Sequence, residues 1–357
     1  MNRIGNLLSL STFGESHGVG LGGVLDGMPA GVSIDFNEVQ AMIDRRRTGR
    51  NPLTSQRKES DVPEVFSGIS QDGRTLGTPI GFLFRNVDAR SRDYGELETH
   101  FRPNHADYTY QKKYGLRDAR GGGRASARET VNWVMGGAIV MQWLKTLGIS
   151  IEAKVTQVGA CGYVDPFGKM IENPSITQFQ EEPEIEEGMM KEVEAARSER
   201  DSVGGRVSCI IRNLPAGLGS PVFGKMQARL AAAMMSINAA KGFEYGLGMR
   251  AAEMRGSESL DLFSEGFEPL PLKSNRNGGV LGGITNGMPV FFNVAFKPTP
   301  TIARALPMPD EEGKTKDILV EGRHDPCVAL RAPVIVESLA ALVVGDMLLE
   351  SGLSSID

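Results

Sequence analysis

The stretch Gly18-Val-Gly-Leu-Gly-Gly-Val-Leu-Asp-Gly-Met-Pro29 carries the strongest local signal for the fold. Its Val and Leu residues favour a strand, and its glycines let the backbone turn tightly or approach another group closely. A second stretch, Gly278-Gly-Val-Leu281 followed by Asn286-Gly-Met-Pro289, has a similar pattern. This echo suggests two similar halves related by a pseudo-twofold axis. No low-complexity linker separates them, so we expect a single domain over residues 1–357.

The rest of the chain is expected to form both strands and helices. Strands are expected at residues 4–12, 19–34, 80–85, 149–158 and 203–212, with one or two more within 280–296. Helices are expected at residues 37–47, 127–146, 184–200, 223–237 and 334–353. Asn37 is a candidate cap for the first helix, and the acidic helix at 184–200 is expected to lie on the surface.

The composition is that of a globular protein and excludes some functions. The chain has 40% apolar and 23% charged residues, and its net charge of -5 argues against a dedicated nucleic-acid binder. Three well-separated cysteines, Cys161, Cys209 and Cys327, show no metal-binding spacing, so we expect reduced thiols in a cytoplasmic protein and no metal site. We expect no signal peptide, and no stretch approaching the roughly 18 apolar residues of a membrane helix.

Two short motifs match functions that their context contradicts. Gly14–Gly18 fits the G-x-S-x-G pattern of serine hydrolases, and Gly18–Gly23 fits the G-x-G-x-x-G pattern of dinucleotide-binding folds, with Asp44 about 20 residues further on. Both motifs require a helix directly after them. The residues that follow are strand-like, so we discount both interpretations.

Histidines are candidates for acid–base chemistry. Of the four, His17, His105 and His324 lie in loops rich in Gly, Pro or Arg, whereas His100 has no such motif. Imidazole titrates near neutral pH and suits proton transfer. A lone histidine is commonly structural, and on the residues alone both roles stay open.

Arginines cluster in two places. One group lies at residues 45–50, and the second follows residue 117 and surrounds Gly121-Gly-Gly123. Residues 102–129 hold seven Lys or Arg against three Asp or Glu. Guanidinium groups match phosphate and carboxylate geometry, and a Gly run lets backbone N–H groups approach an anion. A small polyanionic ligand therefore fits better than RNA, which favours aromatic interleaving, or than an unliganded surface loop.

Six segments together resemble one family. Gly14-Glu-Ser-His-Gly18, Gly121-Gly-Gly-Arg-Ala-Ser-Ala-Arg-Glu-Thr130 and Arg323-His-Asp-Pro-Cys327 resemble, in order, the signature segments of chorismate synthases. Phe101-Arg-Pro-Asn-His-Ala-Asp107, Met235-Ser-Ile-Asn-Ala-Ala-Lys-Gly242 and Lys297-Pro-Thr299 are also similar to that family. The resemblance implies an α/β (α+β) sandwich, with helices packed between antiparallel sheets, a pseudo-twofold repeat and a homotetramer.

The resemblance also implies a reaction. Chorismate synthases are lyases that remove phosphate from 5-enolpyruvylshikimate 3-phosphate by 1,4-anti elimination, which gives chorismate in the last common step of the shikimate pathway to the aromatic amino acids. They require reduced FMN (FMNH2), although the reaction involves no net redox change. Bifunctional members reduce FMN with NADPH, but this chain shows no nicotinamide-binding pattern, so we expect an external flavin reductase.

By motif match, the resemblance implies a role for each site residue. His17 is expected to protonate the leaving phosphate, His105 to meet the flavin N1–O2 edge, and Asp325 to assist proton removal. The expected substrate-binding residues are Ser16, Arg46, Arg102, Arg128 and Arg323. The expected FMN-binding residues are Arg124, Ala125, Ser126, Asn238, Ala239, Gly282, Lys297, Pro298, Thr299, Pro300, Thr301 and Arg323.

This chain departs from the family pattern at two positions. Pro52 stands where the family has a basic residue, and Arg50 is the expected substitute. Pro300 and Thr301 stand where the family commonly has two serines, which affects side-chain hydrogen bonds to a flavin phosphate. Two alternative functions also stay open: a flavin- or nucleotide-dependent oxidoreductase, and a non-enzymatic module that binds phosphosugars or other anions.

Overall fold

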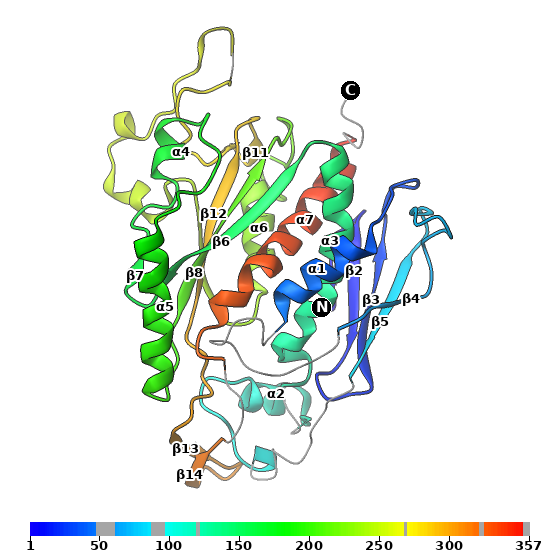
Figure 1. Cartoon of the computed structure of the whole chain (residues 1–357), viewed down its shortest axis with the longest axis vertical. Helices are drawn as coiled ribbons and strands as arrows, with labels where there is room; N and C mark the ends of the chain where they lie inside the picture. The colour runs from blue at the N-terminus through cyan, green and yellow to red at the C-terminus, as the bar shows by residue number, and fades with distance from the viewer. Residues whose placement is uncertain (48–60, 87–96, 119–121, 268–269, 321–324, 353–357) are drawn as a thin grey trace.

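The structure is a computed structural model that describes residues 1–47, 61–86, 97–118, 122–267, 270–320 and 325–352. Two antiparallel sheets of five strands lie on either side of a layer of helices (Figure 1). The first sheet has the order β1-β2-β3-β5-β4, with bounds Arg3–Ile4, Ser9–Gly14, Gly20–Asp26, Ile80–Arg85 and Glu64–Val65. The second has the order β7-β6-β8-β12-β9, with bounds Cys161–Gly162, Ser150–Val158, Gly205–Arg212, Val290–Phe296 and Ala240–Tyr245.

Four helices form the middle layer: α1 (Phe36–Arg46), α3 (Thr130–Thr146), α6 (Met226–Met235) and α7 (Ala332–Ser351). Helix α3 packs on β2 and β3 of the first sheet, whereas α7 packs on β6 and β8 of the second. The two helices also pack closely on each other. A Cβ added at Gly137 would lie only 2.4 Å from Ser338 Cα, so there is no room for a side chain at this position. The predicted arrangement of helices between antiparallel sheets is therefore confirmed.

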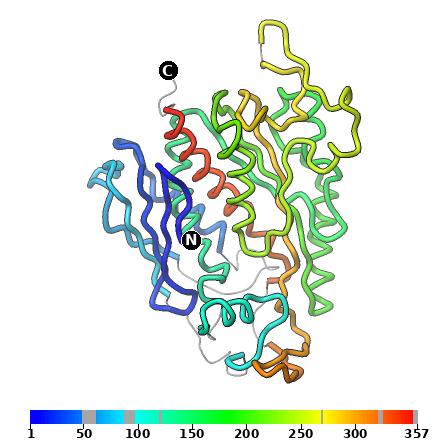
Figure 2. Tube along the Cα trace, turned by 180° about the vertical axis from the view of Figure 1, so that it is seen from behind, coloured from blue at the N-terminus to red at the C-terminus, as the bar shows by residue number. Residues whose placement is uncertain are grey.

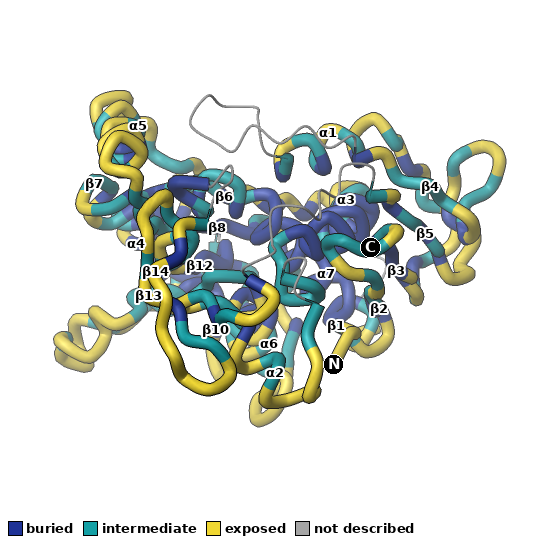
Figure 3. Tube along the Cα trace, turned by 90° about the horizontal axis from the view of Figure 1, so that it is seen from below, coloured by how far each residue is buried: buried dark blue, intermediate teal, exposed yellow. Residues whose placement is uncertain are grey.

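Helix α7 corrects one expectation from the sequence. Within the described residues, the helical stretch Val328–Ser351 is long and apolar enough to cross a membrane, with a mean hydropathy of 1.9, although no such stretch was expected. In its most apolar window, 89% of the residues are buried inside the protein. A helix that is hydrophobic all round belongs in a core. Figure 3 shows this central position, with buried backbone around α7 and exposed backbone along α5 (Pro183–Ser198).

The remaining elements surround the two sheets. The acidic helix α5 packs against the second sheet through Met189 and Val193, which confirms a largely solvated helix. Helix α2 (Asp107–Tyr114) and the hairpin of β13 (Ala305–Pro309) and β14 (Thr315–Leu319) lie together at one end of the molecule (Figures 1 and 2). The short helix α4 (Gly168–Glu172) and the hairpin of β10 (Val280–Leu281) and β11 (Ile284–Thr285) lie toward the opposite end (Figure 1).

Several predicted boundaries were wrong for local reasons. The strand expected at 19–34 ends at Asp26, because Gly27 has φ +85° and Pro29 follows. Helix α1 begins at Phe36, and Asp35 rather than Asn37 caps it by accepting the Asn37 N–H at 2.8 Å.

Three other boundaries moved as well. A 3₁₀ turn over Ala127–Glu129 precedes α3, so that helix starts later than expected. Helix α6 is shorter than the expected 223–237, and residues 280–296 hold three short strands instead of one or two.

The structure does not confirm the pseudo-twofold repeat. The first echoing stretch forms β3, in the middle of the first sheet, whereas the second forms the separate β10–β11 hairpin. The likeness is local: Gly27 and Gly287 both have φ +85°, and the Met after each is buried. Both discounted motifs lie at the β2–β3 turn with no helix after them, as expected.

Candidate active site

A cavity of about 410 Å³ opens beside α2. It is lined by Glu15, Gly18, Arg102, His105, Ala106, Asp107, Tyr110, Tyr114, Leu116, Arg117, Asp118, Gly122, Gly123, Arg124 and Ala125. These residues come from three separate stretches of chain: the β2–β3 turn, the segment around α2, and the 3₁₀ turn Gly123–Ala125. The volume is within the range of small-molecule sites.

His105 joins this cavity to the segment that follows β12. Its Nε2 lies 2.6 Å from Thr301 Oγ1, a hydrogen bond whose direction depends on the tautomer. The preceding residue, Asn104, has φ 57°, and its carbonyl accepts from Lys297 Nζ at 2.9 Å. Burial, followed by repulsion from Lys241, lowers the pKa of Lys297. Two predicted cofactor-binding residues thus contact the turn that carries His105.

Arg102 is held by a carboxylate. Its Nε and Nη2 donate to the two oxygens of Asp107 at 2.8 Å each, and Arg117 lies 3.7 Å from the same carboxylate. Burial acts to raise the pKa of Asp107, but the hydrogen bonds and charges of the arginines outweigh it and the pKa is lowered. The Arg102 guanidinium is therefore fixed at the cavity wall by a bidentate ion pair.

Predicted flavin-binding residues from three segments also meet. Asn238 Nδ2 donates to the Ala125 carbonyl at 2.7 Å, and the carbonyl of Ala239, which has φ 69°, accepts from the Lys297 N–H at 3.0 Å. Ser126 caps the next turn by accepting the Arg128 N–H.

Arg124 is held on both sides. It donates to Thr12 Oγ1 and to Glu129 Oε2, each at 2.8 Å. Burial raises the pKa of Glu129 against the opposing influence of Thr12 and Arg124.

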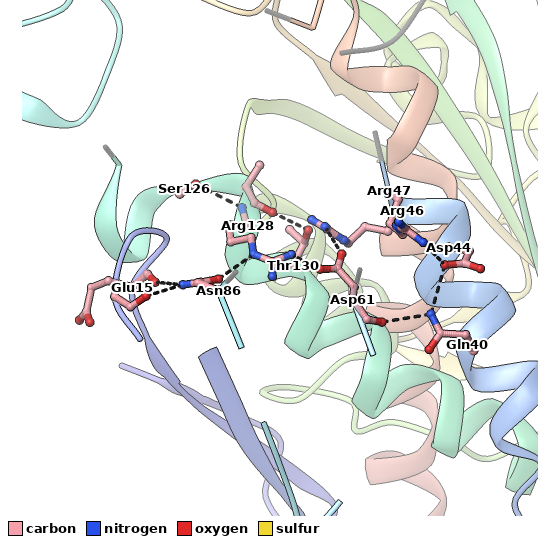
Figure 4. Close-up of polar contacts among 12 residues, drawn as sticks. Glu15, Gln40, Asp44, Arg46, Arg47, Asp61, Asn86, Ser126, Arg128 and Thr130 are labelled. Atoms are coloured by element: carbon pink, nitrogen blue, oxygen red, sulfur yellow. Dashed lines mark hydrogen bonds and ion pairs between the residues drawn. The ribbon is translucent and has the colours of Figure 1, made fainter. Parts of the chain in front are cut away.

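His17 lies in a tight turn between β2 and β3. The Gly18 N–H donates to the Glu15 carbonyl at 3.1 Å, and Ser16 Oγ lies 3.0 Å from His17 Nδ1. Asn86 Nδ2 donates to the carbonyls of Glu15 and Gly18 at 3.1 and 2.9 Å, so it clamps both ends of the turn (Figure 4).

Two predicted substrate arginines share one buried carboxylate. Arg46 Nη2 donates to Asp61 Oδ2 at 2.8 Å, and Arg128 Nη1 donates to Asp61 Oδ1 at 2.5 Å (Figure 4). All three side chains are at most 8% exposed. Burial lowers the pKa of Arg46, Asp61 opposes this effect, and Arg128 and Arg331 lower the pKa further. Arg331 in turn pairs with Asp325, at 2.6 Å between Nε and Oδ2.

Known proteins similar to this chain carry one description. The family model described as chorismate synthase matches residues 8–349. The chorismate synthase of Christiangramia forsetii is 46% identical over 99% of both chains, and that of Azobacteroides pseudotrichonymphae is 46% identical over 97% of this chain and 98% of its own.

The chain belongs to the chorismate synthase family.

The fold agrees with this membership. A solved structure titled "Crystal Structure of Chorismate Synthase" superposes with a TM-score of 0.75 at 31% identity, covering 97% of this chain and 93% of the other. A match of this extent supports a chorismate synthase over the two alternatives, an oxidoreductase and a non-enzymatic anion-binding module. The sequence had predicted this family.

Two of the predicted flavin-binding residues carry buried polar atoms that would fit a polar ligand. Within the described part of the chain, the buried atoms Thr299 Oγ1 and Asn238 Oδ1 have no hydrogen-bond partner. Buried polar atoms in native proteins are nearly always satisfied, so a polar ligand is the natural partner for both. Among the described residues, no group of three His, Cys, Asp or Glu could hold a metal ion.

Of the predicted site residues that the structure describes, Arg102, His105, Arg124 and Ala125 line the cavity, and Pro300 and Thr301 line a smaller pocket that shares Arg102 and His105. The other described ones, including His17, Arg46, Arg128 and Asp325, do not line the cavity. Gly282 lies in the β10–β11 hairpin, where the neighbouring Gly283 carbonyl accepts from the Met226 N–H at 2.9 Å, and it does not line the cavity. Arg323 lies outside the described residues, as do His324, Arg50 and Pro52.

Sequence reasoning missed one carboxylate, one amide and one guanidinium that hold the site together. Asp61, Asn86 and Arg331 belong to none of the motifs that carried the resemblance. The only local signal is at Asn86, a polar residue directly after the apolar strand β5, where a strand end often carries functional groups.

Proposed function

We propose that this chorismate synthase eliminates phosphate from 5-enolpyruvylshikimate 3-phosphate by 1,4-anti elimination in the presence of reduced FMN. The observation that carries the proposal is that the segments of His105 and Arg124 line one cavity and are joined by hydrogen bonds to the segments of Asn238 and of Lys297–Thr301. The chemistry that reduced FMN supplies when bound is electron density and a proton acceptor next to the substrate ring. Residues 124–126, 238–239 and 297–301, with Gly282 and Arg323, are the proposed FMN-binding residues.

The arginines are proposed to bind the substrate's anionic groups. The substrate carries one phosphate and two carboxylates, and guanidinium groups match both kinds of anion. Among the described residues of this buried cluster, the arginines Arg46, Arg128 and Arg331 outnumber the carboxylates Asp61 and Asp325, which gives these five side chains an excess of positive charge. An anion that enters would find this charge poorly screened by water. Ser16, Arg102 and Arg323 complete the proposed substrate set.

Three residues are proposed to handle protons. His17 would donate to the leaving phosphate, since a protonated phosphate departs more easily. His105 would hold a proton at Nε2, the atom already hydrogen-bonded to Thr301. Asp325 would assist proton removal, and Arg331, 2.6 Å away, would hold its carboxylate in place.

The proposal extends to how the protein works in the cell. We propose a cytoplasmic homotetramer that obtains reduced FMN from an external flavin reductase. The free cysteines Cys161, Cys209 and Cys327 are in keeping with a reducing compartment. For Cys209 and Cys327, burial raises the pKa of the thiol, which makes both unreactive.

The test is an anaerobic assay of the purified protein with 5-enolpyruvylshikimate 3-phosphate in three arms: photoreduced FMN, oxidised FMN, and no flavin. Chorismate and inorganic phosphate are expected only with the reduced cofactor. Equal product in all three arms would refute the dependence on reduced flavin while leaving the family assignment intact.

A further inference from the structure

Asn86 lies between the turn that presents His17 and the arginine Arg128 (Figure 4). Its amide makes three hydrogen bonds: Nδ2 donates to two carbonyls of the turn, at 3.1 and 2.9 Å, and Oδ1 accepts from Arg128 Nε at 3.3 Å. The residue is half-buried and directly follows β5. One side chain thus connects the proposed acid with a proposed substrate-binding residue.

The chemistry of the partners fixes the orientation of this amide. The carbonyls of Glu15 and Gly18 can only accept, and a guanidinium Nε–H can only donate. Only the orientation with Nδ2 toward the turn and Oδ1 toward Arg128 satisfies all three contacts. A carboxylate at this position would face the two carbonyls with no proton to donate, so the site requires an amide.

Asp61 anchors the other side of Arg128. Its carboxylate takes one terminal nitrogen of Arg128 and one of Arg46, and its side chain has no exposed surface. The Asp61 carbonyl also accepts from Gln40 on α1, at 3.0 Å, which ties its backbone to the middle layer (Figure 4). Without this carboxylate, the two buried guanidiniums would repel each other.

We propose that Asp61 and Asn86 are positioning residues for the elimination: Asp61 holds Arg46 and Arg128 for the substrate's anionic groups, and Asn86 sets the His17 turn relative to Arg128. The inference rests on the proposed role of His17 as the acid for the leaving phosphate. Nothing in either residue's own chemistry requires it to touch substrate, because both act through the side chains that they hold.

The two residues affect different kinetic constants. Removal of the Asn86 amide leaves the Asp61 anchor in place, so substrate binding is retained and His17 is misplaced. A misplaced catalytic group can cost roughly 10²-fold in rate. Asn86→Ala therefore lowers kcat by about that factor, with KM for 5-enolpyruvylshikimate 3-phosphate nearly unchanged. Asp61→Asn instead raises KM, because the carboxylate that neutralises and aligns both arginines is lost.

The deciding experiment is a double-mutant cycle at saturating reduced FMN with wild type, Asn86→Ala, His17→Ala and the double variant. If Asn86 acts through His17, the double variant matches His17→Ala to within about twofold, the scatter of uncoupled sites. Additive losses in the cycle overturn the inference for Asn86. Full activity of His17→Ala contradicts the proposed role of His17 itself, which is a different failure.

Two further variants serve as a control and as a replacement for Asn86→Ala. Asn6→Ala removes an exposed amide that bonds Glu350 near the C-terminal end of α7, and serves as the matched control with wild-type kinetics. Asn86→Asp keeps the acceptor toward Arg128 and loses both donors to the turn. It replaces Asn86→Ala in the double-mutant cycle if Asn86→Ala does not fold. For Asp61, an unchanged KM in a folded Asp61→Asn variant overturns its part of the inference.

Discussion

At the scale of single residues, His105 is the group most fully tied to the proposed flavin position. Its ring nitrogen meets Thr301, and its turn is fixed by Lys297, both from a segment almost two hundred positions further along the chain. These contacts lie in loops at the rim of a cavity, not in the core. Loss of the imidazole is therefore expected to affect catalysis far more than folding.

We predict that His105→Ala loses roughly 10²–10⁴-fold in kcat, the usual contribution of an acid–base group. The measurement is turnover with saturating reduced FMN, alongside thermal unfolding to show an intact fold. His100→Ala is the matched control, because the His100 side chain contacts Thr99 and does not line the cavity. Wild-type turnover by His105→Ala would show that His105 has no part in the chemistry.

The Asp107–Arg102 pair predicts a pH effect on stability. Since the pKa of Asp107 is lowered in the folded protein, the pair stabilises the fold above the ordinary Asp value of about 3.9. This stabilisation is lost as the pH falls through the lowered pKa. The Tm difference between wild type and Asp107→Asn should therefore be largest near neutral pH and shrink under acid. A difference that is constant or grows on acidification would contradict this account.

At the scale of elements, the sequence predicted strands and helices that follow from regular apolar spacing. It missed element ends and side-chain roles that depend on local backbone geometry or on contacts between distant residues. The strand at 80–85 and the helix at 184–200 were predicted closely, because their apolar residues follow a regular spacing. The end of β3 was missed, because a Gly with positive φ overrides the strand pattern. Asp61 and Asn86 could not be predicted, since their roles arise only when residues distant in the sequence meet.

The close contact of α3 with α7 predicts a strong effect of a single methyl group. A Cβ on Gly137 would lie 2.4 Å from both Cα and Cβ of Ser338, so Gly137→Ala forces two core helices apart. Overpacking in a core typically costs about 1–3 kcal/mol, and a backbone clash belongs at the upper end. Gly256→Ala is the control, because nothing lies within 4 Å of its added Cβ. Equal stability of both variants in denaturant unfolding would refute the tight packing.

At the scale of the whole molecule, the site lies at one end of a sandwich whose two sheets hold the middle helices. Each sheet contributes one loop segment to this end: the β2–β3 turn comes from the first sheet, and the segment after β12 comes from the second. The treatment of residues 1–357 as one domain stays a prediction, as does the homotetramer.

The protein as a whole is predicted to depend on reduced flavin made elsewhere. A reductase must hold a nicotinamide where the substrate is proposed to sit, and the only G-x-G-x-x-G motif lies at the β2–β3 turn without a following helix. Purified protein with FMN and NADPH in air should therefore oxidise no NADPH above a no-protein control. Sustained oxidation that scales with protein concentration would show a bifunctional enzyme.

The central claim is that this chain uses reduced FMN catalytically, without consuming it, to eliminate phosphate. The most direct measurement counts chorismate and phosphate formed anaerobically from excess substrate and a limiting, known amount of photoreduced FMN, with no NADPH present. The account predicts equal amounts of both products, each far above the amount of flavin, with the flavin still reduced at the end. Product that stops at one equivalent per flavin, or flavin that ends oxidised in step with product, would contradict it.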